Sequence, residues 1–329
     1  TTGSFLKKLM EPGADPSKMS FFMPDHNGPC RFGQYNQFHR ILFDRLGFSK
    51  AELITPSNDT SYEDIAGKHG QKFRINAWRG FVAADFTRKI YRETRPYEID
   101  RGESDRLYAD SLKRLEKCIE NGAAGLHKVL VGIANDFMAV RVDKSQKKPV
   151  VAINGEIFMR DNAFCNGNIA SRLEDLGVEV IIGPFSEWIY YSTYRFTRDS
   201  RWKGDMKGVI KSKIQAVGQN IIAGSLLKGI KELTDHAKDV SLHDMLRLCN
   251  TYINEFYDGD PPIAMGTSVA LAHRGVSGIA AILPFTCMPG TVVASVSDAF
   301  RKDHGNIPFL NIAYDGQDSV SLETRLQAF

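Results

Sequence analysis

Six short apolar runs, separated by longer segments with helical periodicity, constrain the fold of this chain more than any other feature of its sequence. Each run has three to six residues, is bounded by turn residues and shows little polar alternation, which is typical of strands buried on both faces. The runs are Met19–Met23, Leu53–Thr55, Val150–Ile153, Val178–Ile182, Ile279–Leu283 and Pro308–Ala313. The sequence therefore predicts an α/β protein with parallel sheets.

Glycine stops after the helical segments strengthen this prediction. The pattern over Gln34–Leu46 ends at Gly47, and the pattern over Ile169–Leu176 ends at Gly177. Glycine is favoured directly after a helix because it adopts the left-handed conformation without steric cost. Strand, helix and glycine recur in the order that βαβ units require, and a last helical pattern over Leu322–Phe329 closes the chain.

Two long segments, 71–147 and 188–273, carry helical patterns alone. We therefore predict a first α/β domain over residues 1–147 and a second over residues 148–329, each with one of these segments as a helical insertion. The last four strands suffice for a small parallel sheet, whereas the first two make a sheet that is marginal by itself. Because the sequence opens on Thr1 without a methionine, we expect further strands upstream to complete the first sheet.

One apolar stripe inside the second insertion has the spacing of a helix face. Its residues are Met206, Ile210, Ile214, Val217 and Ile221, and three lysines (Lys207, Lys211 and Lys213) lie mostly away from it. We expect this stripe to pack into the core. A lipid-binding or calmodulin-binding surface is the alternative interpretation.

Charge and cysteine usage exclude several classes of partner. The chain has 42 basic and 39 acidic residues and a formal net charge of +3, which gives no indication of a nucleic-acid or membrane partner. Its five cysteines are odd in number and scattered, which favours a reducing, cytoplasmic compartment. The longest apolar stretch, Ile279–Met288, is too short for a bilayer and is interrupted by Pro284.

Polar and reactive residues follow the predicted strands. Cys30 follows the first strand, Glu156 the third, Glu187 the fourth, Cys287 the fifth and Asp315 the sixth. Ligands of open parallel sheets bind outside the carboxyl ends of the strands. These five residues are therefore the first candidates for a functional site.

Cys30 and Cys287 each sit beside a proline, near a glycine, at the predicted start of a helix. A helix N-terminus stabilises a thiolate, the form that binds metals or acts as a nucleophile. Cys165 also lies just before a predicted helix, downstream of the third strand, whereas Cys118 and Cys249 fall inside helical patterns. We interpret the last two as structural; for Cys165 a buried, inert role stays equally open.

Recognised short motifs are absent. We find no P-loop, no Gly-x-Gly-x-x-Gly after a strand, no Gly-x-Ser-x-Gly and no His-Glu-x-x-His in the sequence. Nucleotide binding and hydrolase chemistry thus have no support. No two cysteines have the spacing of a zinc knuckle or a ferredoxin, so only a metal site built from distant residues is compatible with the chain.

Four of the strand-end loops nevertheless resemble those of the 2-hydroxyacyl-CoA dehydratase superfamily. They are Gly28–Tyr35, Asn154–Asn162, Glu187–Tyr191 and Pro284–Thr291. With the Asp315–Gln317 and Thr324–Leu326 patterns near the C-terminus, the resemblance is closest to the C-terminal region of the large acyl-CoA dehydratase activase-related proteins. It covers most of the chain from Ser4 to Phe329.

The resemblance implies two flavodoxin-like (Rossmann-like) domains with an oxygen-sensitive iron–sulfur cluster, of the 4Fe-4S or double-cubane type, bound by cysteines from different domains. It implies Cys30 and Cys287 as cluster ligands. Cys165 is a further candidate because of its position before a helix, although the relatives often have a small residue there, and a third ligand upstream of Thr1 is the alternative. Glu156 and Glu187 are the candidate catalytic carboxylates, which orient a substrate or move a proton. Each has a surface or helix-capping role as its alternative, and Trp188 and Tyr190 are expected to serve packing.

We therefore expect ATP-coupled, low-potential electron transfer to an acyl-CoA or another small substrate, as a dehydratase-type lyase or a reductase component. Because the chain has no phosphate-binding loop, the ATP-hydrolysing activator must be a separate protein or domain. The alternative is a cluster-free scaffold or binding domain that docks an activase or a dehydratase subunit. A homo-oligomer stays open.

Overall fold

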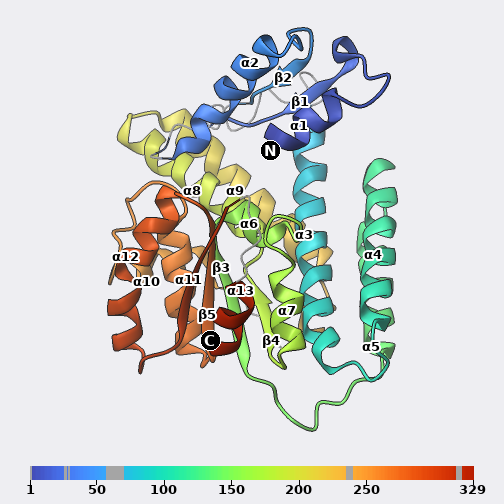
Figure 1. Ribbon diagram of the computed structural model, residues 1–329, viewed down its shortest axis with the longest axis vertical. Helices are drawn as coiled ribbons and strands as arrows, with labels where there is room; N and C mark the ends of the chain where they lie inside the picture. Colours follow the sequence, from blue (N-terminus) through green and yellow to red (C-terminus); the bar gives the residue numbers. More distant parts are fainter. Residues whose placement is uncertain (1, 26–27, 29, 57–69, 235–239, 316–320) are drawn as a thin grey trace. The chain divides into compact units, whose positions relative to one another are not determined.

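The computed structural model describes residues 2–25, 28, 30–56, 70–234, 240–315 and 321–329. The chain forms two compact units, Thr1–Phe73 and Arg74–Phe329 (Figure 1). The domains predicted from the sequence meet at residues 147 and 148, whereas these units meet at residues 73 and 74.

The first unit is built on two parallel strands. Ser20 pairs with Glu52 and Phe22 with Ile54. Its elements are α1 (Thr2–Leu9), a 3₁₀ turn (Pro16–Lys18), β1 (Ser20–Phe22), a second 3₁₀ turn (Arg31–Gln34), α2 (Tyr35–Arg45) and β2 (Glu52–Ile54). The connection between two parallel strands by a helix is the βαβ arrangement that the glycine stop at Gly47 predicted.

A small aromatic core holds the first unit together. Phe43 is fully buried, and its ring lies 5.4 Å from that of Phe21 in an edge-on arrangement. Phe5 packs on Phe21 with ring centroids 4.8 Å apart. His39 is 1% exposed beside these rings, and burial lowers the pKa of its imidazole.

The second unit contains a four-stranded sheet in the order β4-β3-β5-β6. All three pairings are parallel, as in Val151 with Val180, Ala152 with Ile279 and Ile282 with Ile312. The strands are β3 (Val150–Gly155), β4 (Glu179–Ile182), β5 (Gly278–Pro284) and β6 (Phe309–Tyr314).

Helices cover both faces of this sheet and also form a separate bundle within the second unit (Figure 1). They are α3 (Gly70–Thr94), α4 (Glu103–Glu120), α5 (Leu126–Ala139), α6 (Ile157–Asp161), α7 (Ile169–Asp175), α8 (Ser186–Trp202), α9 (Met206–Leu226), α10 (Leu242–Cys249), α11 (Pro261–His273), α12 (Met288–Asp303) and α13 (Leu322–Ala328). Short 3₁₀ turns at Arg95–Tyr97 and Lys231–Leu233 complete the described elements.

The two faces of the sheet have separate core layers. Val151 and Ile153 of β3 pack with α7 and α13 on one face. Ala152, which points to the other face, packs with α10, α11 and α12. This alternation is expected of a strand covered on both sides and explains why the strand sequences are continuously apolar.

Side-chain caps fix where several helices begin. The Asp205 carboxylate accepts a hydrogen bond from the Gly208 N–H at 3.0 Å at the start of α9. The Ser241 hydroxyl does the same for the Asp244 N–H at 3.1 Å at the start of α10. Each cap satisfies a backbone donor that the first turn of a helix leaves without an intrahelical partner.

The bundle packs a long α3 against α4, α5, α8 and α9. Leu130 and Ile133 of α5 are fully buried in its core. Trp78 of α3 donates its indole N–H to the Gln219 carbonyl of α9 at 3.1 Å, and Tyr190 of α8 lies edge-on against Trp78. Tyr190 thus serves packing, as predicted.

All six predicted strands are confirmed, each within two residues at either end. The α/β class with parallel sheets is likewise confirmed. Within the described residues, both segments predicted to be helical insertions contain helices and turns, and one isolated bridge joins Glu98 and Val142. Among the described residues, no helix has the length and apolarity needed to cross a bilayer.

The prediction for the apolar stripe of the second insertion is wrong. The stripe lies on α9, and its members are all exposed: Met206 63%, Ile210 57%, Ile214 67%, Val217 58% and Ile221 65%. The opposite face of α9, which includes Ser212 and Gln219, is the buried one. The spacing identified an apolar helix face correctly, but the helix packs through another face, which carries Ser212 and Gln219 together with Val209 and Leu226.

Candidate functional site at the carboxyl edge of the four-stranded sheet

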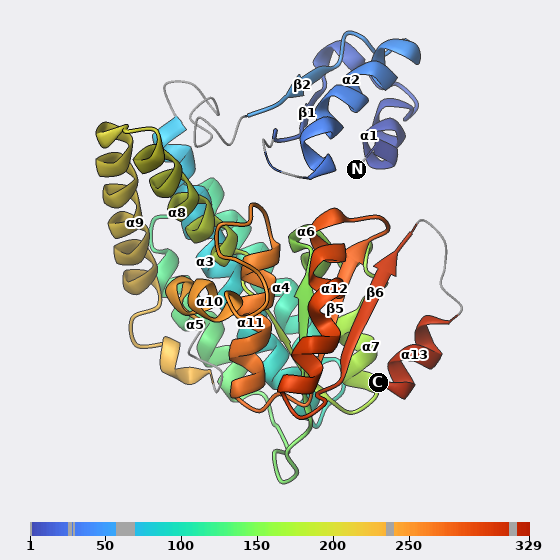
Figure 2. The same cartoon turned by 90° about the vertical axis from the view of Figure 1, so that its left-hand side faces the viewer.

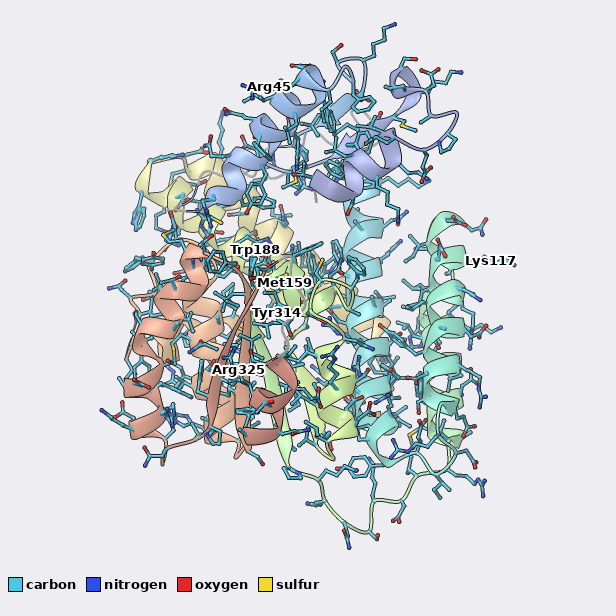
Figure 3. All side chains as sticks on the ribbon, in the orientation of Figure 1. Arg45, Lys117, Met159, Trp188, Tyr314 and Arg325 are labelled. Atoms are coloured by element: carbon cyan, nitrogen blue, oxygen red, sulfur yellow. The ribbon has the colours of Figure 1, made fainter. Side chains whose placement is uncertain are left out.

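The sheet brings four of the predicted residues to one edge. Since all its strands run in parallel, the segments that follow them emerge at the same end. Along that edge they come in the order Glu187 after β4, Glu156 after β3, Cys287 after β5 and Asp315 after β6. Their predicted alignment along one sheet edge is confirmed. Figure 3 marks Met159 of α6 and Trp188 of α8 near this end of the strands.

The strand order reverses at one position along this edge, between β3 and β5. In chain order the sheet reads second, first, third and fourth, so the connections leave β3 on one side and lead to β5 on the other. Such a reversal opens a crevice between the loops after the two central strands, where doubly wound sheets bind their ligands. Glu156 and Cys287 follow those two strands.

A close backbone approach fixes the Glu156 side of this position. The Glu156 N–H donates to the Ile282 carbonyl of β5 at 2.9 Å. Gly155, which precedes it, has φ of 112°, and a Cβ there would lie 2.1 Å from the same carbonyl oxygen. Only glycine fits both the backbone angle and the space.

Glu156 caps α6 through both carboxylate oxygens. They accept hydrogen bonds from the Phe158 N–H at 3.1 Å and the Met159 N–H at 2.8 Å. Burial nevertheless raises the pKa of the Glu156 carboxyl, because it outweighs these donors and the charge of Arg160. The capping role that the sequence left open is therefore real, and it coexists with a carboxyl that holds its proton more tightly than usual.

Glu187 forms a buried ion pair. Its Oε1 lies 2.5 Å from Nη2 of Arg160, and the two side chains are 5% and 3% exposed. The same nitrogen donates to the Pro184 carbonyl at 3.1 Å. Arg160, on α6, thus connects the segment after β3 to the segment after β4, and Glu187 compensates its charge.

Asp260, which the sequence did not indicate, lies beside Arg160 and Glu187. It directly precedes α11, and together with Gly155, Arg160, Glu187 and Trp188 it lines a cavity of about 10 Å³. That volume is close to the space that one water molecule needs. Burial, with the charges of Glu156 and Glu187, raises the pKa of the Asp260 carboxyl to about 7.

Cys287 is the N-cap residue of α12, as its position before Pro289 and Gly290 predicted. Its N–H donates to the Pro284 carbonyl at 3.0 Å, and its own carbonyl accepts from the Thr291 N–H and hydroxyl. The preceding residue, Thr286, has φ of 61°. A β-branched residue in this conformation is a strained outlier, and such strain concentrates at functional sites.

The other two candidate ligands occupy different surroundings. Cys165 lies in the turns between α6 and α7, half-buried against the core layer on that face of the sheet. In the first unit, Cys30 caps the 3₁₀ turn at Arg31–Gln34, and its sulfur accepts the Phe32 N–H at 3.5 Å. Three residues of its loop, 26, 27 and 29, lie outside the described residues.

The remaining cysteines lie in helices, as expected. Cys249 of α10 is fully buried, donates to the Leu246 carbonyl at 3.0 Å, and has a thiol pKa raised to about 12 by burial. Cys118 is half-buried in α4. In the part of the chain that the structure describes, no group of three or more Cys, His, Asp or Glu side chains is arranged to hold a metal ion.

A larger cavity of about 1250 Å³ lies within the second unit and reaches Gly183–Glu187 after β4. Its other walls come from α3, α8, α9 and the segment around α10. Eight basic and four acidic side chains line it, together with apolar residues such as Phe86 and Met245. Arg88, Arg92 and Arg198 are paired with carboxylates. The other basic residues and the apolar residues of this cavity suit an extended anion with an apolar part.

The site residues that the sequence analysis did not single out share one property. Asp260 and the basic residues of the large cavity come from helical segments far in sequence from the strand ends. The one local signal for Asp260 was its position before Pro261 and Pro262, which is typical of a helix start. No family model, no curated protein and no solved structure matches this chain.

Proposed function

We propose that this chain is a cytoplasmic iron–sulfur protein, similar to the 2-hydroxyacyl-CoA dehydratases and activase-related proteins, that takes part in ATP-coupled low-potential electron transfer to an acyl-CoA or another small substrate. The observation that carries the proposal is the position of Cys287. It stands at a helix N-terminus, after a strained residue, at the ligand-binding position of a doubly wound sheet.

The donor chemistry of the candidate residues fits an iron–sulfur cluster. Cysteine thiolates are the ligands that such clusters select, and Cys30 and Cys287 each stand at a helix or turn N-terminus that favours a thiolate. We propose these two as ligands and Cys165 as the third. When bound, the cluster would supply one-electron chemistry at low potential.

The chain's own carboxylates have distinct roles in this proposal. Glu156, with its raised pKa, holds or releases a proton at the substrate. Glu187 keeps Arg160 in place through their 2.5 Å contact, and so positions α6 and the Glu156 loop. The charges of Asp260 and Glu156 interact, so the protonation of one carboxyl depends on that of the other.

The large cavity would receive the non-reacting part of the substrate, because Glu187 lines it and Glu156 and Cys287 do not. An acyl-CoA has phosphates at one end and an acyl thioester at the other, which matches basic and apolar walls in one space of about 1250 Å³. Because the sequence lacks a phosphate-binding loop, the energy for low-potential reduction comes from an ATP-hydrolysing activator protein or domain.

Metal analysis of the full chain, purified without oxygen, tests this proposal. We expect iron and acid-labile sulfide in the wild type and their loss in Cys30→Ala and Cys287→Ala, with Cys165→Ala losing them if it is the third ligand. Cys118→Ala, at a half-buried helical position, is the control and should retain iron. Equal iron content in all four variants would refute the ligand assignment.

The alternative, a cluster-free scaffold that docks an activase or a dehydratase subunit, is favoured by the structural roles of the two carboxylates. Glu156 caps α6 and Glu187 pairs with Arg160, so both have a reason to be present without catalysis. A colourless anaerobic preparation without iron would support this function over the first.

A further inference from the structure

The helix α9 buries a face of mixed polarity, which includes Val209 and Leu226, and exposes a continuous apolar face. Its inward face makes hydrogen bonds to α8: the Thr197 hydroxyl donates to Ser212 at 2.8 Å, and the Gln219 amide donates to the Thr193 hydroxyl at 3.1 Å. Ser212 is 1% and Gln219 7% exposed. Helices of globular proteins normally bury the apolar face and expose the polar one.

The outward face is the α9 stripe, defined by Met206, Ile210, Ile214, Val217 and Ile221, each more than half exposed. Figure 2 shows α9 beside α8 at the margin of the second unit, on the side away from the sheet. Since the buried side of α9 is hydrogen-bonded to the unit, the helix cannot bury the stripe by rotating. A continuous exposed apolar face of this kind marks an interaction surface.

The spacing of the stripe identifies the kind of surface that fits it. From Ile210 the residues follow at intervals of four, three and four, which is the alternation of core positions in a coiled coil. The partner surface is therefore a helix with the same spacing. The helix α9 itself meets this requirement.

Charge decides the direction in which two copies of α9 pair. The helix has no acidic residue, and Lys211 and Lys213 flank the stripe. In an antiparallel coiled coil, Ile214 packs against Val217 of the second copy and Ile210 against Ile221 of the second copy. The flanking positions then place Lys211 opposite Gly218 and Lys213 opposite Asn220, which are uncharged, so that no lysine faces a lysine.

A parallel pairing has no such property, because it places equivalent core residues of the two copies together, and Lys207 lies in the same heptad register as Ile214 and Ile221. Lys207 of one copy would then meet Lys207 of the other in the seam, which costs free energy, whereas the antiparallel pairing places it opposite Gly224. We propose that α9 is a homodimer interface, in which the α9 stripes of two copies of this chain pack antiparallel about a twofold axis near residues 215 and 216.

Sedimentation equilibrium of the full chain tests the dimer. Two helices of this length make an interface smaller than the standard size, so we expect dissociation in the micromolar range and a dimer at about 100 μM. Ile214→Lys should make the protein monomeric without loss of stability, because residue 214 is exposed. Met138→Lys, at a position 60% exposed on α5, is the matched control and should leave the dimer intact.

Cross-linking tests the direction. About the proposed axis, two Cys residues from Val217→Cys are about 4.5 Å apart along the helices, and two from Ile210→Cys about 16 Å. A short bismaleimide should therefore link the Val217→Cys dimer alone, above the background of the native cysteines in the wild type. Efficient linking of both variants would indicate a parallel pairing and contradict the proposal.

Two further results would overturn the proposal that α9 is a homodimer interface. One is a monomer at about 100 μM, far above the dissociation constant expected for a surface of this size. The other is co-sedimentation of monomeric wild type with anionic phospholipid vesicles that Ile214→Lys abolishes, which would assign the stripe to a lipid surface. Each result is independent of iron content, so failure here leaves the proposed function standing.

Discussion

The two units place a cysteine in the same local setting but support it by very different means. In both, a parallel strand is followed by a loop whose cysteine stands at the start of a helix or turn: Cys30 in the first unit and Cys287 in the second. The first unit supports its loop with two strands of three residues, β1 and β2, and a core cluster of four buried apolar residues. The second has four strands with a core layer on each face.

This difference indicates that local geometry and local stability are separate properties. A two-stranded sheet is marginal unless other elements cover it, and regions with few buried apolar contacts open with low free energy. We therefore expect backbone amides of β1 and β2 to exchange with solvent faster than those of β3 and β5. The tryptophans make the units distinguishable, because Trp78, Trp188 and Trp202 all belong to the second.

The largest effect should come from the glycines. Gly155→Ala in the second unit forces a Cβ to within 2.1 Å of the Ile282 carbonyl at a φ of 112°, which we expect to cost about 5 kcal/mol of unfolding free energy. Gly47 in the first unit also has a positive φ, 83°, but a Cβ there would lie in open space. Gly47→Ala should therefore cost only about 1 kcal/mol of unfolding free energy.

Urea denaturation followed by tryptophan fluorescence measures the first variant, and amide exchange in α2 and β2 measures the second. If both substitutions cost the same, the close approach between β3 and β5 does not restrain the Glu156 loop. The contrast between the units would then rest on core size alone.

The buried ion pair gives the next effect. Arg160→Met leaves the Glu187 carboxylate buried without its 2.5 Å partner, and we expect a loss of about 3 to 4 kcal/mol. The double variant Arg160→Met, Glu187→Met should recover most of it, since apolar pairs of similar volume replace buried ion pairs at little cost. Fluorescence-detected denaturation measures both. A double variant as unstable as the single one would show that Arg160 acts through contacts other than Glu187.

The fold could be predicted from the sequence where the burial of a single segment determines its pattern of apolar residues. Strands such as β3 and β5 are covered on both faces, so their sequences are apolar throughout and both strands were found from the sequence. The placement of Glu156 and Cys287 at one edge of the sheet followed from parallel pairing. These are consequences of local pattern combined with one topological rule.

The rest of the site depends on long-range packing, which no local pattern encodes. Asp260 is 73 residues from Glu187 in the sequence, and it reaches the site because α11 packs against β3. The α9 stripe was assigned to the core because periodicity shows that a helix has an apolar face, but not whether this chain covers it. The polar residues that anchor α9, Ser212 and Gln219, decide that question through partners on α8.

Opposite responses to pH give the sharpest contrast between the units. Asp260 in the second unit has a pKa raised from 3.8 to about 7, mainly by burial. Between those two values the folded state binds more protons than the unfolded state, so stability falls as the pH rises from about 4 to 7. Each unit of pKa shift corresponds to about 1.4 kcal/mol. Asp260→Asn should remove this slope from fluorescence-detected unfolding between about pH 4 and 7.

His39 in the first unit has the reverse sign. Burial lowers the pKa of its imidazole below the ordinary value of 6.5, so the unfolded state binds the proton more tightly and the first unit loses stability as the pH falls through 6.5. Its ring is 1% exposed, and Nε2 lies 2.9 Å from the Thr2 hydroxyl, which leaves little room for solvation of the charged form. Amide exchange in α2, corrected for the intrinsic rate, should therefore accelerate on acidification in the wild type and less in His39→Gln. Acidification from pH 7 to pH 5 should thus stabilise the second unit while it loosens the first, and a parallel response of both units would contradict these two assignments.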